Sequence, residues 1–563
     1  MKKINLAFAQ DITEANYIME NSKHNIVWVP LNLETMMYFE QKKINYINPN
    51  KLLNNHFHKK GLEQWSKLEK KLIKIMLLEE SLKYRYKGII RKFFNSIFFL
   101  IEVISKIEKK YKINSLVLSG WNNYNQKSIK DNYICSKILN DLYKRKFNII
   151  LIDEIKDNFN HQVSELDYRI QNTKKKKILF TDLNYNFLRI IYSCLFNKNL
   201  AIYILDLHSK KSLRKFFLKL AGVRFISVYN SIKKKQKKFK LALGEISYKY
   251  KNFDLSDLIK YRGFQIKKNL SEIKLKNEVL DKVYKYLKPN LTILNNVRGN
   301  NFYITKLGKK YNLNTMILSH GTLSQGDNKF EKMYQKIIAE ELINKYAKYL
   351  CLQNKILERS LKTIEASNKF IKTGNIIFSE AKQNRKSFFL YAVTQRDFVN
   401  MQFYGIETFY EFYENLNFLN NLAKKYNYRF LVKLHPNINK TIKPLKKKFL
   451  NLKFTNKSIQ KLLSETIATI SFSSTAIDDS LSSGVPVILL DRVNRYSHDS
   501  TQKNNKLENK AVFYCNNKSD FIKKLEHATS KNDFNFNYYS YGGNYKDNIK
   551  ENILNFIVLL IFG

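Results

Sequence analysis

The sequence predicts an α/β fold built on parallel sheets. Short apolar runs of strand length recur along the chain and alternate with longer stretches of helical character. Strands that alternate with helices favour parallel sheets with right-handed crossovers. At 563 residues the chain also exceeds the size of one ordinary core, so we expect at least two domains.

The expected strands are short apolar runs that lie between polar segments. In chain order they are Ile4–Ala9, Ile26–Val29, Leu116–Leu118, Ile149–Ile152, Ile178–Phe180, Ile202–Leu205, Phe225–Val228, Leu291–Leu294, Thr315–Leu318, Tyr349–Leu352, Phe370–Lys372, Phe388–Val393, Phe430–Leu434, Ala468–Phe472, Val487–Leu490 and Val512–Tyr514. Polar residues after Gly374 and at Lys382–Lys386 interrupt this series, so we place a domain boundary there.

We therefore expect an N-terminal domain over residues 1–380, with insertions in about 55–275, and a C-terminal domain over residues 381–563. Two longer apolar stretches, Phe93–Ile104 and Phe556–Phe562, are too short to span a bilayer. Core packing is the favoured interpretation of both, and a shallow membrane contact is the alternative. The second stretch is expected to be a C-terminal helix that packs back on the N-terminal domain.

The composition favours a partner or substrate that is rich in phosphate. The chain has 99 Lys and Arg against 48 Asp and Glu, a net charge of +51. Gly (16) and Pro (6) are scarce beside many Lys, Tyr and Phe residues, which indicates AT-rich codon usage and places much of the charge on solvated faces. The four cysteines form no CxxC pair, which argues against a zinc site or a disulfide framework and fits a reducing, cytoplasmic compartment.

The strongest chemical signal is a Ser-rich turn in the second domain. The strand Ala468–Phe472 ends in Ser473-Ser474-Thr475, and a helix is expected to begin near Ala476. Backbone N–H groups at a helix start, together with small hydroxyl side chains, can bind a phosphate. A carboxylate about one turn further on can accept from ribose hydroxyls, and Asp479 occupies that place. Simple N-capping by the serines is the structural alternative, and it is compatible with phosphate binding.

Two other strand ends in this domain supply polar groups. Lys433 and His435 share one face of their strand by alternation, and Pro436 ends that strand. A histidine at such a strand end can donate to a donor phosphate or stabilise a leaving group. Thr394 and Gln395 follow the first strand of the domain, where they could contact phosphate or base.

The segment Leu291–Gly321 is interpreted as one strand–helix–strand unit in the N-terminal domain. Its second strand ends in Ser319-His320-Gly321-Thr322, and Arg298 lies in the turn after its first strand. Because ligands of such sheets bind at the carboxyl ends of strands, His320 is expected at a cleft. We assign Arg298, Ser319, Gly321 and Thr322 to the acceptor side of that cleft.

Three of these segments together resemble the GT-B superfamily of surface-carbohydrate enzymes: the His-Gly-Thr turn, the Lys-x-His-Pro-Asn strand end and Ser-Ser-Thr-x4-Ser-x3-Gly-x-Pro. Within it, the sequence is similar to capsule polysaccharide biosynthesis proteins, the Kdo- and sialic-acid-transferring groups and the teichoic-acid glycerophosphotransferases. The resemblance covers about Leu287–Asp491 and touches Val29–Ile47. It implies a GT-B-like α/β fold, with two Rossmann-like domains whose parallel sheets face a central cleft.

By this resemblance, His435, Ser473, Ser474 and Thr475 hold the phosphate of the donor. Asp479 stands where the family has its ribose-binding acid. The sialyltransferase-like groups use an acidic pair followed by Gly as general base, and this sequence has no such tripeptide. His320 is therefore one candidate for the base, and Asp11 and Glu14, after the first strand, are the others.

The sequence thus predicts a bacterial glycosyltransferase that moves a sugar from a CMP- or UDP-linked donor to a surface polysaccharide or lipid-linked glycan. No metal or cofactor is expected, and contact with an anionic inner-membrane surface is expected to accompany the donor and acceptor. The alternatives are a CDP-glycerol-type glycerophosphotransferase, a sugar-nucleotide epimerase or hydrolase, a non-catalytic GT-B scaffold and a basic nucleic-acid-binding protein. No RNP-type, zinc-finger or helix-turn-helix signature supports the last of these.

Overall fold

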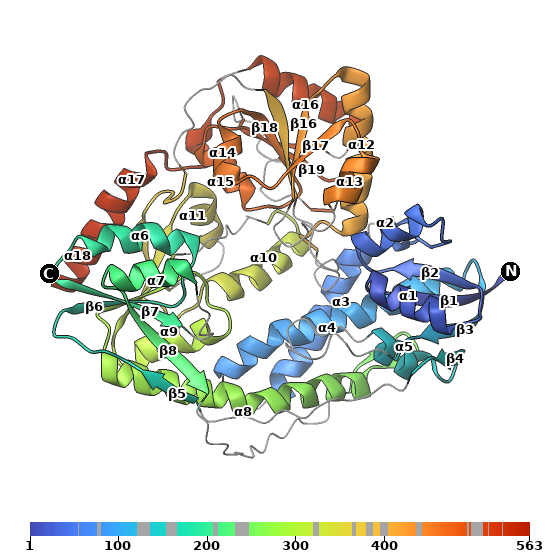
Figure 1. Ribbon diagram of the computed structural model, residues 1–563, viewed down its shortest axis with the longest axis horizontal. Coiled ribbons are helices and arrows are strands. Elements are labelled where there is room, and N and C mark those ends of the chain that lie inside the picture. The colour runs from blue at the N-terminus through green and yellow to red at the C-terminus, as the bar shows by residue number, and fades with distance from the viewer. Residues whose placement is uncertain are drawn as a thin grey trace.

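The computed structural model describes most of the chain. The described residues are 1–53, 56–75, 80–120, 135–153, 166–206, 212–230, 247–318, 326–362, 367–378, 387–393, 404–434, 442–492, 495–496, 510–515, 517–531 and 533–562. Within these ranges the strands form three large sheets and one small ribbon, and helices cover the sheets (Figure 1). We name the large ones the N-terminal, central and C-terminal sheets.

The N-terminal sheet contains parallel strands in the order β2-β1-β3-β4. Its strands are β1 (Lys3–Ala9), β2 (Ile26–Pro30), β3 (Lys112–Leu118) and β4 (Asn148–Leu151), with helices α1 (Ile12–Asn21), α2 (Leu33–Gln41) and α5 (Cys135–Tyr143) beside them. The first two helices begin where Asp11 and Asn32 accept a backbone N–H hydrogen bond as N-caps. Apolar side chains of β1 point to both faces, so the sheet is covered on each side.

Long helices cross between the N-terminal and central sheets (Figure 1). They are α3 (His56–Ile75), α4 (Glu80–Ile107) and α8 (Ser256–Leu287). The apolar stretch Phe93–Ile104 lies in α4, and its apolar side chains are all buried in the large core that these helices share. Core packing is therefore confirmed for this stretch, and it presents no apolar face to a membrane.

The central sheet has the strand order β14-β13-β12-β11-β6-β7-β8-β5. Its strands are β5 (Leu166–Arg169), β6 (Lys176–Phe180), β7 (Leu200–Asp206), β8 (Arg224–Asn230), β11 (Leu291–Leu294), β12 (Asn314–Ile317), β13 (Tyr349–Leu352) and β14 (Lys369–Lys372). All neighbouring pairs are parallel except β5 with β8. Ile178 and Phe180 of β6 pack beneath α6 (Tyr185–Leu195) and α7 (Leu213–Leu220), and Leu179 packs beneath α8 on the opposite face.

The C-terminal sheet is parallel and has the order β17-β16-β15-β18-β19-β20. Its strands are β15 (Phe388–Ala392), β16 (Phe430–Lys433), β17 (Leu452–Thr455), β18 (Thr466–Ser471), β19 (Val487–Leu490) and β20 (Val512–Cys515). Its helices are α12 (Phe409–Tyr426), α13 (Ile442–Lys448), α14 (Ile459–Leu463), α15 (Ala476–Ser482) and α16 (Lys518–Ser530). Each strand of this sheet except β17 was expected from its apolar run.

The remaining elements connect the sheets. They are η1 (Pro49–Lys51), the ribbon β9 (Lys249–Tyr250) and β10 (Phe253–Asp254), α9 (Asn300–Lys310), α10 (Lys329–Leu342), α11 (Lys355–Leu361), η5 (Phe536–Tyr538), α17 (Tyr545–Asp547), the π-helical η6 (Asn548–Leu554) and α18 (Asn555–Phe562). Ile549, Ile553, Ile557 and Ile561 join the core between α6 and the central sheet. The end of the chain therefore leaves the C-terminal sheet and packs on the central one (Figure 1).

The predicted α/β class with parallel sheets is confirmed. Each expected apolar run forms a strand, and the structure adds β5, β17 and the β9–β10 ribbon. Residues 1–380 contain two large sheets within their described part, the N-terminal and the central one, where the sequence predicted one Rossmann-like unit with insertions. The inserted stretch of about 55–275 supplies β3 and β4 to the N-terminal sheet and β5 to β8 to the central sheet.

Candidate functional site

The carboxyl-terminal edges of the central and C-terminal sheets meet at α15. Asn354, which follows β13, donates its side-chain amide to Asp478 of α15 at 3.3 Å. Asn375, which follows β14, donates to the hydroxyl of Ser482 at the other end of α15, at 3.1 Å. Because ligands of parallel sheets bind at these edges, the contact makes the start of α15 the best candidate for a site.

The turn before α15 has the predicted strand–serine–helix form. Ser473 donates its hydroxyl to the carbonyl of Gly405 at 2.5 Å, so its proton is held by the backbone. The Ser474 hydroxyl accepts the N–H of Ala476 at 3.2 Å, and Thr475 is exposed. Thr475 is the N-cap residue of α15, its side chain makes no capping hydrogen bond, and of the three residues it is the one most open to a ligand.

Asp479 lies in the first turn of α15 and is half-buried. None of the described residues donates a hydrogen bond to that carboxylate. Burial, and then the neighbouring charge of Asp478, raise the pKa of Asp479 well above its usual value. An acceptor in this state gains most from a ligand that brings hydroxyl donors.

Lys433 ends β16, next to β15 in the sheet. Its side chain is half-buried, and burial lowers the pKa of its ammonium group. The Nζ atom lies 3.5 Å from the carbonyl of Leu434. A partly desolvated cation at a strand end is well suited to an anionic group of a ligand.

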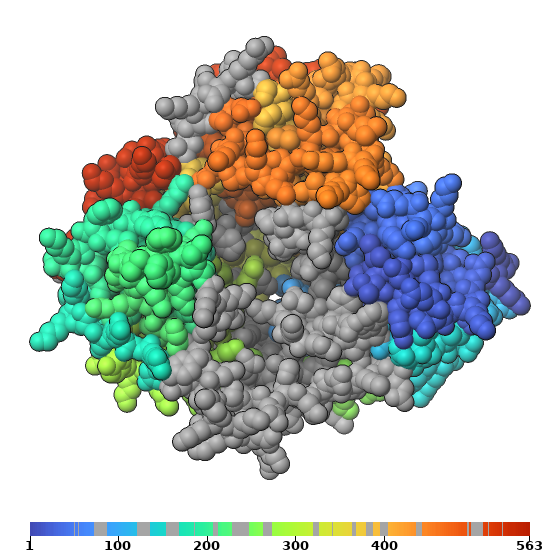
Figure 2. All heavy atoms as spheres, in the orientation of Figure 1, coloured from blue at the N-terminus to red at the C-terminus, as the bar shows by residue number. Residues whose placement is uncertain are grey.

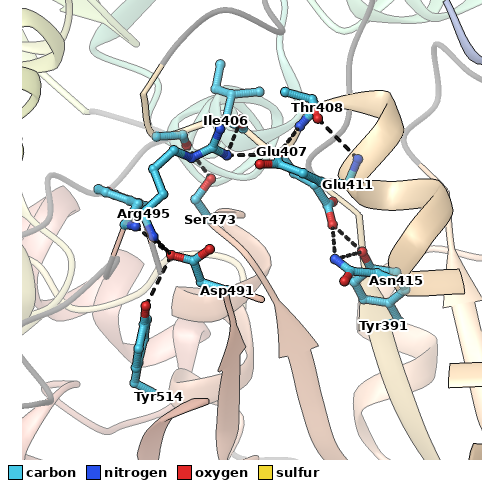
Figure 3. A network of polar contacts seen from close by, with 12 residues as sticks. Tyr391, Ile406, Glu407, Thr408, Glu411, Asn415, Ser473, Asp491, Arg495 and Tyr514 are labelled. Atoms are coloured by element: carbon cyan, nitrogen blue, oxygen red, sulfur yellow. Dashed lines mark hydrogen bonds and ion pairs between the residues drawn. The ribbon is translucent and has the colours of Figure 1, made fainter. Parts of the chain in front are cut away.

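A buried arginine, which the sequence did not single out, lies close to the Ser473 turn (Figure 3). Arg495 donates its Nη2 to the carbonyl of Ile406 at 3.0 Å and to Glu411 at 2.9 Å. Since Ser473 binds the adjacent carbonyl, of Gly405, the two side chains hold consecutive peptide groups of one turn. Within the described part of the chain, Nε and Nη1 of Arg495 have no hydrogen-bond partner.

Asp491, at the end of β19, holds the backbone that carries this arginine (Figure 3). Its carboxylate accepts the N–H groups of Arg495 and Tyr496, the second at 2.6 Å, and the hydroxyl of Tyr514 at 3.1 Å. An acidic residue directly after an apolar strand was the sequence signal that could have indicated this network. Its pairing with Arg495 could not be seen, because the network also needs Glu411 from α12.

The two acidic base candidates lie at the edge of the N-terminal sheet. Asp11 caps α1 by accepting the N–H of Glu14 at 2.8 Å. The Glu14 carboxylate is buried and accepts the N–H of Gln10 at 2.8 Å and the Ser119 hydroxyl at 2.9 Å. Burial raises the pKa of Glu14 to about 7, because it outweighs those hydrogen bonds.

This edge touches the C-terminal sheet through other residues. The Tyr410 hydroxyl of α12 donates to the carbonyl of Pro30, at the end of β2. Tyr413 of the same helix donates to Glu40 of α2 at 2.5 Å. The N-terminal sheet is thus packed against α12, and the described contacts do not join Glu14 to α15.

On the central sheet, the expected acceptor residues are only partly visible. Arg298 is exposed in the turn after β11. The expected Ser319, His320, Gly321, Thr322, Thr394, Gln395 and His435 lie outside the described residues. Asn295, in the same turn after β11, donates to Asp182 at 2.9 Å, and Asn184 donates to it at 2.7 Å. Burial raises the pKa of Asp182. Asp182, Asn184 and Asn295 therefore form a polar cluster at the carboxyl-terminal edge of the central sheet, where the neighbouring strand β12 also ends.

Among the described residues, no three His, Cys, Asp or Glu side chains gather in an arrangement that could hold a metal ion. In that same part of the chain, no helix has both the length and the apolar character needed to cross a membrane.

No family model and no curated protein match this sequence. Among solved structures, the chain is similar to the UDP-GlcNAc 2-epimerase of Methanocaldococcus jannaschii in complex with UDP-GlcNAc and UDP, at 14% identity and a TM-score of 0.41, over 69% of this chain and 99% of that one. It is also similar to MurG of Acinetobacter baumannii, at 10% identity and a TM-score of 0.37, over 69% and 99% of the two chains. Likenesses this low in identity and TM-score do not bear on the activity or the site of this chain.

Proposed function

We propose that this chain is a GT-B-type glycosyltransferase that works without a metal ion and moves a sugar from a nucleotide donor to a glycan or lipid-linked acceptor. The observation that carries the proposal is the contact of Asn354 and Asn375 with α15, which brings together the carboxyl-terminal edges of two parallel sheets. One sheet can then hold the donor and the other the acceptor. The sequence motifs at these edges support the same assignment.

In this proposal the C-terminal sheet holds the donor. Thr475, the backbone at the start of α15, Lys433 and His435 receive the phosphate groups. Asp479 accepts from the ribose hydroxyls, which would supply the donors that its carboxylate lacks among the described residues. As the sugar leaves, the same cationic groups stabilise the charge that builds up on the phosphate.

For the general base we favour His320 over the two acidic candidates. In sequence, His320 follows β12 of the central sheet. The residues that follow β13 and β14 of the same sheet, Asn354 and Asn375, contact α15. The Asp11 carboxylate is engaged as a helix cap, and the Glu14 carboxylate is enclosed by Gln10 and Ser119. A histidine near its ordinary pKa can deprotonate an acceptor hydroxyl at neutral pH.

Calorimetric titration of the purified chain with UDP, CDP, CMP and GDP tests the donor site. We expect one of these nucleotides to bind, and the double substitution Ser474→Ala with His435→Ala to weaken its binding at least about tenfold. The double variant loses the hydroxyl that accepts the N–H of Ala476 and a side chain that we assign to the donor phosphate. The control is Ser212→Ala, which removes a serine hydroxyl that accepts a backbone N–H at the start of α7, on the central sheet and away from the proposed donor site. Equal affinity in the double variant and the control would contradict the donor site.

Turnover separates the two transfer reactions that such a site can support. Release of a free nucleotide from a nucleotide-sugar in the presence of a glycan acceptor is the expected result. Release of CMP from CDP-glycerol would instead identify an alcohol-phosphate transferase. Nucleotide binding together with slow release of the sugar to water, unchanged by any acceptor, would contradict glycosyl transfer.

A further inference from the structure

Most of the large apolar side chains that the described residues leave exposed lie on three helices of the central sheet. They are Tyr192 and Phe196 at the end of α6, Leu213, Phe216, Phe217 and Leu220 on α7, and Val558, Leu559 and Phe562 on α18. All three helices contribute to one core over the same face of the sheet, and Figure 1 shows them together on the left. We call these residues the outer apolar patch.

Helix α7 carries the most exposed part of the outer apolar patch. Leu218 is the residue of α7 that is buried against the sheet, at 1% exposure. Phe216, Phe217 and Leu220 are 57%, 63% and 70% exposed. In the space-filling view, α7 (green, on the left) lies at the surface that faces the viewer (Figure 2). Soluble proteins rarely expose contiguous large apolar groups without a partner for them.

Basic groups surround the same helix. Arg214 and Lys219 of α7 are exposed, and Lys198 follows Phe196 on the neighbouring turn. A cavity of about 1240 Å³ opens at the end of α7, and Arg169, Lys219 and Arg224 are among the residues that line it. The charge of Lys215, the other lysine of α7, is instead neutralised by an ion pair with Asp206. Aromatic and aliphatic side chains beside exposed cations are typical of helices that lie in a membrane interface.

We propose that the outer apolar patch docks the protein on an anionic phospholipid bilayer, with Phe216, Phe217 and Leu220 entering the interface and the basic cavity receiving a lipid phosphate. A second copy of the chain fits this surface less well. The chain carries a net charge of +51, so two copies that met through a patch ringed by cations would repel each other. An anionic lipid surface supplies the opposite charge and an apolar layer together.

Vesicle sedimentation tests this proposal without any nucleotide, so its outcome is independent of the donor site. The full-length chain is mixed with vesicles of phosphatidylcholine alone or with added phosphatidylglycerol. We expect strong, salt-sensitive binding to the anionic vesicles only.

The double substitution Phe216→Ser with Phe217→Ser should lower the partition coefficient at least about tenfold. Arg214→Gln and Lys219→Gln should each lower it about fivefold on anionic vesicles.

Leu450→Ser provides the matched control, because Leu450 is 81% exposed but lies beyond α13 on the C-terminal lobe. It should leave sedimentation unchanged, and thermal unfolding should be the same for all variants, since only exposed side chains are replaced. Equal binding of the phenylalanine variant and the control would overturn the proposal, as would a wild-type chain that ignores anionic vesicles. Wild-type dimers that the phenylalanine variant dissociates, without vesicle binding, would assign the patch to self-association.

Discussion

The Asp479 carboxyl group is partly withdrawn from water and receives no hydrogen bond from the described residues. Such a group costs folding free energy, and a protein regains that free energy when a ligand supplies the donors. Its pKa is raised for the same reason, because the charged form is the one that burial penalises. Asp479 is therefore the residue at which the proposed recognition of a donor is most directly measurable.

We expect Asp479→Asn to weaken binding of the preferred nucleotide about tenfold, because an amide replaces one of the two accepting oxygens by a donor and a lost hydrogen bond costs about 1 kcal/mol or more. The wild-type chain should bind the ribonucleotide more tightly than its 2′-deoxy form, and the variant should bind both alike. Calorimetry with the two nucleotides measures this difference, with the exposed Asp547→Asn as control. If Asp479→Asn still distinguishes the two forms as the wild type does, the ribose contact is elsewhere.

Glu14 makes stability depend on pH. Its pKa in the folded chain is about 7, above the ordinary value of 4.5, so the folded state binds more protons between these values. Stability from this group is then present at low pH and declines as pH rises from about 4.5 to 7. A shift of this size corresponds to about 3 kcal/mol.

Urea denaturation of Glu14→Gln at several pH values checks this effect. Glutamine keeps the size of the side chain but cannot ionise, so the free energy of unfolding of the variant should rise relative to the wild type by up to about 3 kcal/mol between pH 5 and pH 8. A difference between the two proteins that stays constant over this range would show that Glu14 is not the titrating group.

The buried charge of Arg495 fixes the backbone next to the Ser473 turn. Its guanidinium group lies 4.8 Å from the centre of the Phe472 ring and pairs with Glu411, another buried residue. Burial raises the pKa of Glu411, and the arginine opposes this shift. The arginine thus holds the turn at residues 405–406 against Ser473, and so helps to define the edge of the sheet where we place the donor.

At the level of elements, two glycines with a left-handed backbone allow the chain to turn where a strand or a helix ends. Gly120, just after β3, has φ of +66°, and a Cβ atom at this position would lie 2.0 Å from the carbonyl oxygen of Asp153. Gly222, just after α7, has φ of +87° with open space around it. The two glycines therefore share a left-handed backbone but differ in the room for a side chain.

This pair of glycines gives a matched test of the N-terminal sheet. Gly222→Ala should cost about 1–2 kcal/mol, which is the price of the left-handed conformation alone. Gly120→Ala should cost clearly more, because the backbone of residue 153 must also move. Urea denaturation of the two variants measures the difference. Equal losses would mean that the turn at Gly120 relaxes freely and does not tie β3 to the end of β4.

Across the whole molecule, three sheets meet through a few long-range contacts. Asn354 and Asn375 join the central sheet to α15, and Tyr410 joins the C-terminal sheet to the end of β2. The helix α10 adds aromatic contacts, since Tyr334 packs on Tyr404 and Tyr496. The proposed donor site lies on the C-terminal sheet and the outer apolar patch on the central one, so docking through the patch would leave the proposed donor site accessible.

Much of the fold was predictable because burial leaves a local trace in the chain. Buried parallel strands are apolar on both faces, so runs such as Val487–Leu490 are visible without any partner. The edge strands β5 and β17 were missed because charged residues interrupt them, as in Leu166–Arg169 and Leu452–Thr455. The turn at Ser473 was visible for the same local reason, as a strand end followed by small polar residues.

The tertiary structure decided what those local signals touch. Arg495 and Glu411 are 84 positions apart, and Asn354 and Asp478 are 124 apart, so no periodicity of the chain relates them. The existence of a third sheet likewise depends on which strands pair, and strands of equal apolar character can pair in many orders. Periodicity is a property of neighbouring residues, whereas the burial of a charge and the pairing of strands depend on segments that only folding brings together.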